Sequence, residues 1–377
     1  MRVAYFSDSL PPIADGVSRT LCRLLETLLE ERIDFRIFSA VKPGPEHPWS
    51  DRVHKLPSVP FPPYPDYRVA LPFAPSLDWL VADFAPDLVH VVSPTPLGMY
   101  GLDVARRQHL PAVGSFHTDF VSYFPFYGLA GLELQGWRYL RWFYNRCTTT
   151  FAPSADTRAK LRRYGIDRVE LWERGIDRRA FSPAHRSAAL RQRLGAPERP
   201  ILLYVGRLVR EKNLLDLAAA ADSLARRGDR FALVIVGDGP MAGELKALLP
   251  QAHFAGFRQG EDLAQWYASA DVFVFPSTTE TFGNVILEAF ASGLPVVAAD
   301  RGGVRDLVRP GENGVLARPG APDDFARRIH DLLANPAGLE RLRAGALQTA
   351  GRYHWPAVNR RLLDGYRSVL ARAARAA

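Results

Sequence analysis

The segment Ser277-Thr-Thr-Glu-Thr-Phe-Gly-Asn-Val-Ile-Leu-Glu288 joins two patterns that together decide the fold. The run before it, Ala270–Pro276, is apolar, β-branched and aromatic, and predicts a buried strand. A helical period begins near Gly283. Glu280 is therefore expected in the loop at the carboxyl end of a strand, and Glu288 in the helix that follows.

The start of this helix is a predicted anion site. Backbone N–H groups from Phe282 to Val285 lie where helical donors are unpaired and the helix dipole is positive. Carboxylates on both sides of such a site suggest a ligand with hydroxyls and phosphate, such as a nucleotide sugar. For either glutamate alone, a solvated side chain is an equally ordinary interpretation.

The same alternation of strand and helix extends over the chain. Strands are expected at 34–39, 87–92, 111–115 and 201–205, among others, and helical patterns lie between most of them. This order predicts α/β architecture with parallel, doubly wound sheets. The Pro- and Tyr-rich stretch 57–75 is expected to be an ordered surface loop.

Composition restricts the class of protein. The 377 residues suit two domains, and 47% hydrophobic with 23% charged residues indicates a globular chain. The net charge of +8 could attract phosphate, anionic lipid or nucleic acid, but no nucleic-acid-binding signature accompanies it. No apolar run of about 18 residues is present. An early Asp8 argues against a signal peptide, and Cys22 and Cys147 lie in apolar contexts, so a cytoplasmic protein with buried thiols is expected.

Three further loops at predicted strand ends carry candidate ligand-binding residues. Gly206-Arg-Leu-Val-Arg-Glu-Lys212 follows a strand and places two cations beside a helix start, which suits a diphosphate. Gly16 opens the first helix, without the G-x-G-x-x-G pattern of a dinucleotide site. His117 follows the strand at 111–115, where a ligand-binding or a structural role is open.

Two aromatic segments admit more than one interpretation. The stretch 121–128 is interpreted as an acceptor-facing loop. The segment 137–146 interleaves aromatic residues with Arg, which suits either a core helix or a helix at a lipid interface.

Together these motifs resemble the retaining glycosyltransferases of family 4. The matching elements are the Glu280-x7-Glu288 spacing, Gly206-Arg-Leu-x-x-Glu-Lys212, the His117-Thr pair and Asp15-Gly-Val-Ser18, and Asp306 stands where the family usually has Glu. The resemblance implies the GT-B fold, in which two Rossmann-like domains face each other across a cleft. It implies a first domain over 1–180, a nucleotide-sugar-binding domain over 181–354 and a final helix over 355–377 that crosses back.

The resemblance also assigns roles. His117 and Glu280 would contact the transferred sugar, Arg207 and Lys212 the diphosphate, and Glu288 the nucleotide ribose. The remaining donor-binding residues would be Gly16, Glu211, Phe254, Phe282, Gly283, Asn284 and Val285. Neither a metal nor a cofactor is expected, since fixed cations and helix amides would stabilise the leaving diphosphate.

The linker Trp172-x-Arg-Gly-Ile-Asp177 resembles that of bacterial glycolipid mannosyltransferases and sulfoquinovosyl lipid synthases. GDP-mannose and a membrane glycolipid are therefore the expected substrates, and an anionic membrane surface at the inner face a further expected partner. A UDP-hexose or UDP-sulfoquinovose donor is the alternative. Two readings outside this class are a non-catalytic, basic membrane-binding protein and a GT-B phosphorylase, for which no pyridoxal-phosphate lysine motif is seen.

Overall fold

The computed structural model describes all residues except 14, 62–63, 72–74 and 377. Contacts divide the chain into two units. Unit 1 comprises Met1–Val121, Gly131–Arg174 and Trp355–Ala377, and unit 2 comprises Ser122–Ala130 and Gly175–His354. The chain therefore passes from unit 1 to unit 2 between Arg174 and Gly175, and the short segment 122–130 packs with the second unit.

Unit 1 is built on a parallel sheet of seven strands in the order β3-β2-β1-β6-β7-β8-β9. The order reverses between β1 and β6, so the sheet is doubly wound, as the alternating pattern predicted. The strands are β1 (Arg2–Ser7), β2 (Asp34–Ser39), β3 (Val53–Lys55), β6 (Leu88–Val91), β7 (Ala112–Ser115), β8 (Thr149–Ala152) and β9 (Val169–Leu171).

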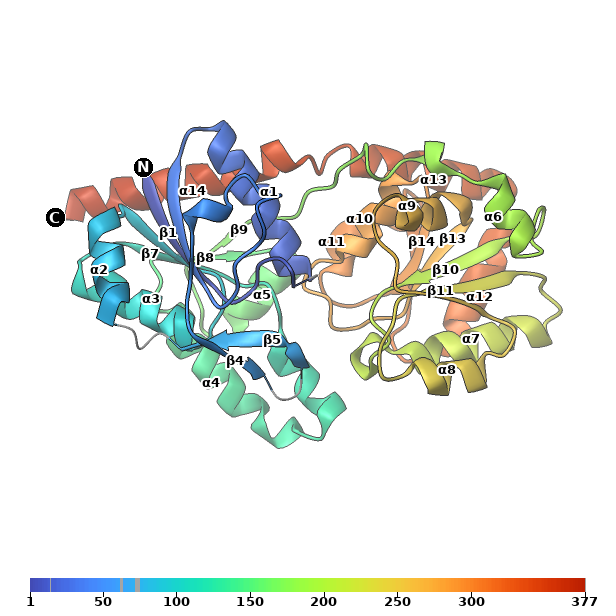
Figure 1. Ribbon diagram of the computed structural model, residues 1–377. Helices are drawn as coiled ribbons and strands as arrows, with labels where there is room; N and C mark the ends of the chain where they lie inside the picture. The colour runs from blue at the N-terminus through green and yellow to red at the C-terminus, as the bar shows by residue number, and fades with distance from the viewer. Residues whose placement is uncertain (14, 62–63, 72–74, 377) are drawn as a thin grey trace. The chain divides into compact units, whose positions relative to one another are not determined.

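Helices cover both faces of this sheet (Figure 1). They are α1 (Gly16–Glu30), α2 (Pro75–Phe84), α3 (Pro96–Arg107), α4 (Glu133–Tyr144), α5 (Ala155–Arg163) and α14 (Trp355–Ala376). Helix α14 packs on α1, where Asn359 Nδ2 donates to the Arg23 carbonyl at 3.0 Å. On the opposite face, Gly101 of α3 lies so close to Phe6 that an added Cβ would come within 2.8 Å of its ring.

A β-hairpin replaces part of the loop predicted at 57–75. Strand β4 (Ser58–Phe61) pairs antiparallel with β5 (Tyr64–Ala70). Arg68 Nη2 donates to the Ser58 carbonyl at 2.6 Å and fastens the two strands. The prediction was wrong here because a two-stranded ribbon tolerates Pro on its unpaired edges, whereas Pro in sequence suggests a loop. The rest of the predicted loop is partly outside the described residues.

Unit 2 repeats the architecture with a parallel sheet in the order β12-β11-β10-β13-β14-β15. Renumbered within the unit this is 3-2-1-4-5-6, the order of dinucleotide-binding Rossmann sheets. The strands are β10 (Ile201–Val205), β11 (Ala232–Val236), β12 (His253–Gly256), β13 (Val272–Phe275), β14 (Val296–Ala299) and β15 (Gly314–Ala317).

In unit 2, helices α7, α8 and α12 lie on one face of the sheet and α9, α10 and α13 on the other (Figure 1). The helices are α6 (Ala188–Arg193), α7 (Leu214–Arg226), α8 (Ala242–Leu248), α9 (Gly260–Ser269), α10 (Asn284–Ala291), α11 (Val304–Leu307), α12 (Pro322–Leu333) and α13 (Pro336–Ala350). Short 3-10 turns precede two of them, η4 (Pro183–His185) before α6 and η5 (Arg210–Lys212) before α7.

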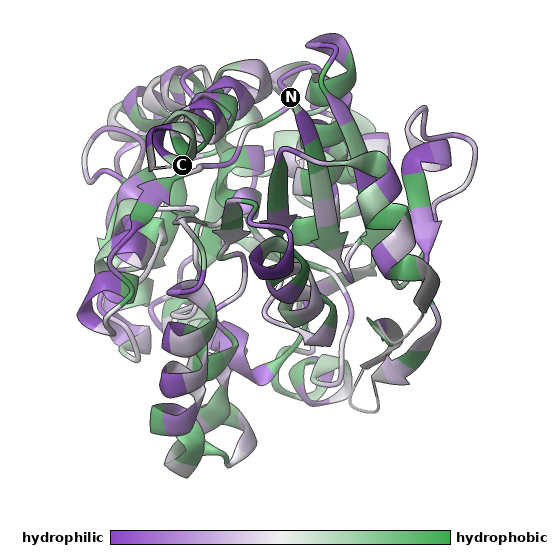
Figure 2. Ribbon diagram, turned by 90° about the vertical axis from the view of Figure 1, so that its left-hand side faces the viewer, coloured by the Kyte–Doolittle hydropathy of each residue, from purple (hydrophilic) through white to green (hydrophobic). Residues whose placement is uncertain are grey.

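The cores lie between sheets and helices. Strands β1, β10, β13 and β14 are buried almost throughout, because both faces of a parallel sheet are covered. Figure 2 shows the same pattern, with largely hydrophobic strands and helices that alternate hydrophobic and hydrophilic residues. Cys147 is buried and Cys22 half-buried, and both are free thiols.

The aromatic segment 137–146, for which a core helix and a helix at a lipid interface were both predicted as alternatives, lies mostly on helix α4. Trp137, Leu140, Phe143 and Tyr144 recur at helical spacing and are buried, so one face of α4 belongs to the core. Trp142 is 44% exposed on the other side. No helix in the described part of the chain has the length and apolar character needed to cross a membrane.

Candidate active site

The residues predicted to bind diphosphate follow strand β10, and those predicted to bind sugar follow β13. The two strands are neighbours, and the winding of the sheet changes direction between them. At such a point the loops after the two strands diverge to opposite faces and leave a crevice at the sheet edge. Topology alone therefore brings Arg207, Lys212 and Glu280 to one location in unit 2.

Lys212 and Glu280 form an ion pair in this location. Lys212 Nζ donates to Glu280 Oε1, and Ser277 Oγ donates to the same oxygen at 2.8 Å. The two charged side chains are 12% and 16% exposed. Oε2 of Glu280 accepts no hydrogen bond from the described residues, so one carboxylate oxygen is left for a ligand hydroxyl.

Burial alone would raise the pKa of Glu280, but Lys212, Ser277 and the more distant Arg207 together hold that pKa below its ordinary value. Glu280 is therefore a carboxylate at neutral pH. An ionised carboxylate accepts hydrogen bonds and donates none, which fits a role in holding sugar hydroxyls.

Glu211 connects a second set of residues. It is 1% exposed, and its Oε1 accepts from Arg207 Nη2 at 3.2 Å. Its Oε2 accepts from Tyr127 Oη at 2.9 Å. The Arg207 side chain is 53% exposed, so the guanidinium is held by Glu211 at one end and remains accessible to solvent.

Tyr127 is a site residue that no motif in the sequence indicated. It ends the 3-10 segment η2 (Phe120–Tyr127), which was predicted only as an acceptor-facing loop. Its partner Glu211 is 84 positions away, so no local pattern indicates the contact.

The amino end of α10 lies beside Glu280, as predicted. Gly283 caps the helix with φ 105°, a conformation that glycine adopts readily. The neighbouring Gly302 and Gly303 make room for this loop: a Cβ on Gly302 would lie 2.7 Å from the Glu280 carbonyl oxygen, and Gly303 N donates to that oxygen at 2.9 Å. The glycine pair therefore serves the close approach of the two loops.

The side chains near the start of α10 differ in whether a bound ligand could contact them. Phe282 is 3% exposed and its ring packs on Tyr353, so only its backbone can meet a ligand. Val285 packs against the core. Asn284 Oδ1 is buried and has no hydrogen-bond partner among the described residues. A buried acceptor without a donor is uncommon in native proteins, and a bound ligand is one way to supply it.

Glu288 and Phe254 lie further from the ion pair along the chain. Glu288 is buried on α10, and its Oε2 accepts from Tyr267 Oη of α9 at 2.9 Å. Phe254 lies on β12 with its ring partly packed against the core and Lys246 Nζ 5.8 Å from the ring centre.

Unit 1 carries Gly16 and His117. Gly16 is the first residue of α1, whose cap is Asp15: Oδ1 of Asp15 accepts from Ser18 N at 2.7 Å. At the point where the order of this sheet reverses, Thr95 Oγ1 donates to Asp8, and Ala70 N donates to the same carboxylate at 3.0 Å. These two contacts join the loops after β1 and β6 to the end of β5.

His117 follows β7, and its Nδ1 lies 2.9 Å from Arg174 Nη2. The imidazole ring also meets Trp172 edge to face, with ring centres 5.6 Å apart. Burial, the Arg174 charge and His90 hold the pKa of His117 well below its ordinary value. His117 is therefore neutral at physiological pH.

Both halves of the chain match family models. Residues 14–179 match "Glycosyltransferase Family 4" and residues 199–335 match "Glycosyl transferases group 1". A GDP-mannose-dependent alpha-mannosyltransferase of Mycobacterium tuberculosis is 37% identical over 99% of this chain and 98% of its own length. The chain belongs to glycosyltransferase family 4. The sulfoquinovosyl transferase SQD2 of Arabidopsis thaliana is 32% identical over 96% of this chain and 72% of its own length.

Solved structures establish the fold of this family 4 glycosyltransferase. Anabaena HepE in complex with UDP aligns with a TM-score of 0.79 over 98% of this chain and 100% of HepE, at 21% identity. The GT-B fold predicted from the motifs is confirmed, with one Rossmann-like sheet in each unit.

The glycosyltransferase thus gathers most of its predicted site residues at one sheet edge of unit 2. Lys212 contacts Glu280, Arg207 contacts Glu211, and the α10 amino end lies beside them, whereas His117 and Gly16 belong to unit 1. The roles assigned to these residues stay predictions. In the described part of the chain, no cluster of three or more His, Cys, Asp or Glu side chains could hold a metal ion.

Proposed function

We propose that the enzyme transfers mannose from GDP-mannose to a hydroxyl of a glycolipid or another acceptor, with retention at the anomeric carbon. The Lys212–Glu280 pair beside the start of α10 carries the proposal, because it offers a cation to a diphosphate and a carboxylate to a sugar in one place. The names of the mycobacterial relatives support mannose as the sugar.

In this proposal the bond between C1 of the sugar and the diphosphate oxygen breaks, and its electron pair leaves with GDP. Lys212 and Arg207 would stabilise the charge that develops on the diphosphate, together with N–H groups at the start of α10. Glu280 Oε2 would accept a sugar hydroxyl, and His117 would hydrogen-bond the same sugar. The acceptor oxygen would bond to C1 from the side that the diphosphate leaves, and its proton would pass to a diphosphate oxygen.

We propose further that no metal ion or cofactor takes part, because fixed cations are supplied by the chain. Transfer assayed with EDTA and with added Mg²⁺ tests this part. Equal rates are expected, and a rate that requires Mg²⁺ would contradict it.

The donor is tested with a panel of GDP-mannose, UDP-glucose and UDP-sulfoquinovose, with release of GDP or UDP as the readout. Hydrolysis and thermal stabilisation need no acceptor, so they can be measured first. We expect the largest response to GDP-mannose, and an α-configured product by NMR of the anomeric proton. Preference for UDP-sulfoquinovose would favour the alternative donor, which the similarity to SQD2 supports.

The acceptor side is proposed to meet an anionic membrane. On α4 and the turn before it, Leu132, Leu134 and Trp142 are 48%, 66% and 44% exposed. The exposed surface of α4 also carries Arg138 and Arg141, and Arg146 follows the helix with its guanidinium over the Trp142 ring at 3.8 Å. Exposed apolar residues among arginines suit a lipid headgroup layer.

Co-sedimentation with vesicles tests this surface. Binding is expected to vesicles of phosphatidylglycerol and weaker binding to phosphatidylcholine, and Leu134→Glu combined with Trp142→Glu should reduce it. Equal binding by the double variant would rule out this face as the docking site.

A further inference from the structure

Arg174 is a buried cation for which neither the motifs nor the proposed reaction gives a role. It belongs to the Trp172-x-Arg-Gly-Ile-Asp177 linker and is the last residue of unit 1 before the chain enters unit 2. Arg174 is only 4% exposed, and none of the ion pairs found among the described residues includes it. Burial lowers its pKa to about 9, so it stays charged at neutral pH. A buried charge without a counter-ion is costly, which calls for a compensating role.

The guanidinium is held rigidly by the linker itself. Nη1 donates to the Trp172 carbonyl at 2.6 Å and to the Glu173 carbonyl at 3.1 Å. The charged carbon lies 5.0 Å from the centre of the Trp172 ring, which adds a cation–π contact. These contacts leave Nη2 aimed at one side chain, His117, with its Nδ1 at 2.9 Å.

This contact fixes the proton of His117. A guanidinium has donors and no lone pair, so Nδ1 of His117 must accept. In a neutral imidazole the proton then lies on Nε2, which becomes a donor. An imidazolium would set N–H against N–H, and the opposite tautomer would do the same.

The arrangement is the reverse of a serine-protease triad. There a carboxylate accepts from Nδ1–H, so that Nε2 keeps a lone pair and acts as a base. Here a cation occupies the lone pair of Nδ1, so that Nε2 carries hydrogen and has no basic site. A base beside an electron-poor sugar carbon could also activate water, which the Nε2–H tautomer does not do.

We infer that Arg174 is a positioning residue that holds His117 as the neutral Nε2–H tautomer, so that His117 donates a hydrogen bond to the transferred sugar and does not act as a base. The consequence for catalysis rests on the proposed function, whereas the tautomer does not. The proton of the acceptor hydroxyl would then leave with the diphosphate, not through His117.

The tautomer can be read directly by NMR at pH 7 without substrate. Protein labelled with ¹⁵N-histidine contains nine histidines, and the His117→Gln variant identifies the signals of His117. We expect a protonated Nε2 and an unprotonated Nδ1 in the wild type. An Nδ1–H tautomer or an imidazolium would overturn the inference, whatever the variants do.

Variants of Arg174 test the cause. Arg174→Met should release Nδ1 and give a mixture of tautomers, and Arg174→Lys should restore the wild-type pattern, because an ammonium also only donates. Arg361→Met is the matched control: Arg361 pairs with the neighbouring Glu173 at 2.8 Å, so this change removes a cation beside the linker but no contact to His117. An unchanged His117 spectrum in Arg174→Met would also overturn the inference. If that variant does not fold, the wild type and Arg174→Lys still decide.

Kinetics separate positioning from a structural role. Arg174→Met should lower kcat about 10-fold and leave the KM for the nucleotide sugar within about 2-fold, as expected for a lost hydrogen bond to a charged group. Partial recovery in Arg174→Lys is expected. A kcat equal to that of the wild type would refute the catalytic part. Absence of transfer from any donor in the wild type would refute the proposed function and leave the tautomer result standing.

Discussion

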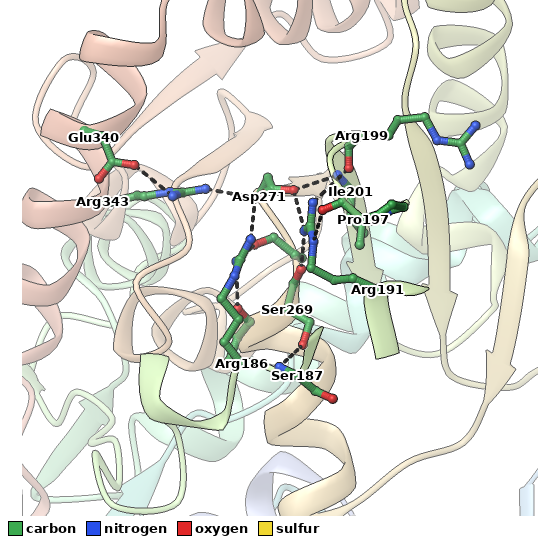
Figure 3. Close-up of polar contacts among 12 residues, drawn as sticks. Arg186, Ser187, Arg191, Pro197, Arg199, Ile201, Ser269, Asp271, Glu340 and Arg343 are labelled. Atoms are coloured by element: carbon green, nitrogen blue, oxygen red, sulfur yellow. Dashed lines mark hydrogen bonds and ion pairs between the residues drawn. The ribbon is translucent and has the colours of Figure 1, made fainter. Parts of the chain in front are cut away.

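A carboxylate with cations around it lies near each end of strand β13: Asp271 directly before the strand and Glu280 in the loop after it. The two clusters differ in whether both carboxylate oxygens accept hydrogen bonds from the described residues. At the amino end, both oxygens of Asp271 are occupied: Oδ1 pairs with Arg186 and Arg343, and Oδ2 with Arg191 and the Ile201 N–H (Figure 3). At the carboxyl end, both contacts of Glu280 go to Oε1, from Lys212 and Ser277.

The cations of the two clusters also differ in how many hydrogen-bond partners they have. Arg191 is 7% exposed, and it also donates to the carbonyls of Pro197, Arg199 and Ser269 (Figure 3). Lys212 has three N–H donors, and Glu280 is its one hydrogen-bond partner in the described part of the chain. A saturated cluster holds the chain together, whereas a cluster with spare donors and acceptors can bind a ligand.

The largest effect is expected at the amino end of β13, where both oxygens of Asp271 have partners. Asp271→Asn removes the charge that compensates buried Arg191, and breaking a buried pair in this way costs about 3–5 kcal/mol. The free energy of unfolding, measured by urea denaturation at pH 7, should fall by about that amount. Asp262→Asn is the control, because its pair with Arg258 is exposed and should contribute less than about 1 kcal/mol. Equal effects of the two changes would contradict the assignment.

The same cluster predicts a pH dependence. Burial alone would raise the pKa of Asp271, but Arg191, the Ile201 N–H and Arg186 hold it below the ordinary value. A depressed folded pKa stabilises the protein above the pKa of the unfolded chain, and this stabilisation is lost as the pH falls through the folded pKa. The stability difference between wild type and Asp271→Asn should therefore be largest near neutrality and shrink in acid.

At the carboxyl end of β13, Lys212→Ala should reduce kcat about 10²–10³-fold, the loss typical of removing one group that stabilises transition-state charge. The free energy of unfolding should fall as well, because the change leaves the largely buried Glu280 carboxylate without its cation, so kcat is measured at a temperature where the variant is folded. Arg210→Ala is the matched control, because Arg210 is an exposed cation in the same 3-10 turn. Turnover unchanged in Lys212→Ala, or equally reduced in both, would refute the role of Lys212.

Much of the fold could be predicted from the sequence where local pattern decides it. The strands predicted at 34–39 and 201–205 agree with the structure at both ends, and the second is an apolar run bounded by Pro200 and Gly206. The hairpin over β4 and β5 was missed because Pro60 and Pro65 look like loop residues in sequence.

The site could be predicted in part for a related reason. The motifs locate Lys212 and Glu280 at the ends of two strands, and parallel topology then brings such ends together. Contacts such as Tyr127 to Glu211 and Arg174 to His117 join segments 84 and 57 positions apart. Such pairs depend on tertiary packing, which no periodic pattern in one sequence records.

A moderate effect is expected for Glu288→Gln. The amide keeps an acceptor oxygen for Tyr267 but loses the charge that is proposed to hold the nucleotide ribose. Affinity for GDP, measured by calorimetry, should fall about 10-fold, or about 1.4 kcal/mol. Glu261→Gln, an exposed change on α9, should have no effect. If GDP binds Glu288→Gln as tightly as the wild type, Glu288 has no part in ribose binding.

The smallest effect is expected from a change next to Glu211, which is buried like Asp271 but holds Arg207, whose side chain is 53% exposed. Tyr127→Phe removes one of its donors, and a neutral-to-charged hydrogen bond of this kind contributes about 1.5 kcal/mol or somewhat less when partly exposed. We expect kcat/KM to fall about 3- to 10-fold, because Arg207 loses part of the support that fixes its guanidinium.

Tyr164→Phe, in unit 1 with its ring stacked on Trp137 at 3.8 Å, is the control. In a double-mutant cycle with Glu211→Gln, Tyr127→Phe should have little further effect, since both changes act through one carboxylate. Additive losses would show that Tyr127 acts through a contact other than the one with Glu211.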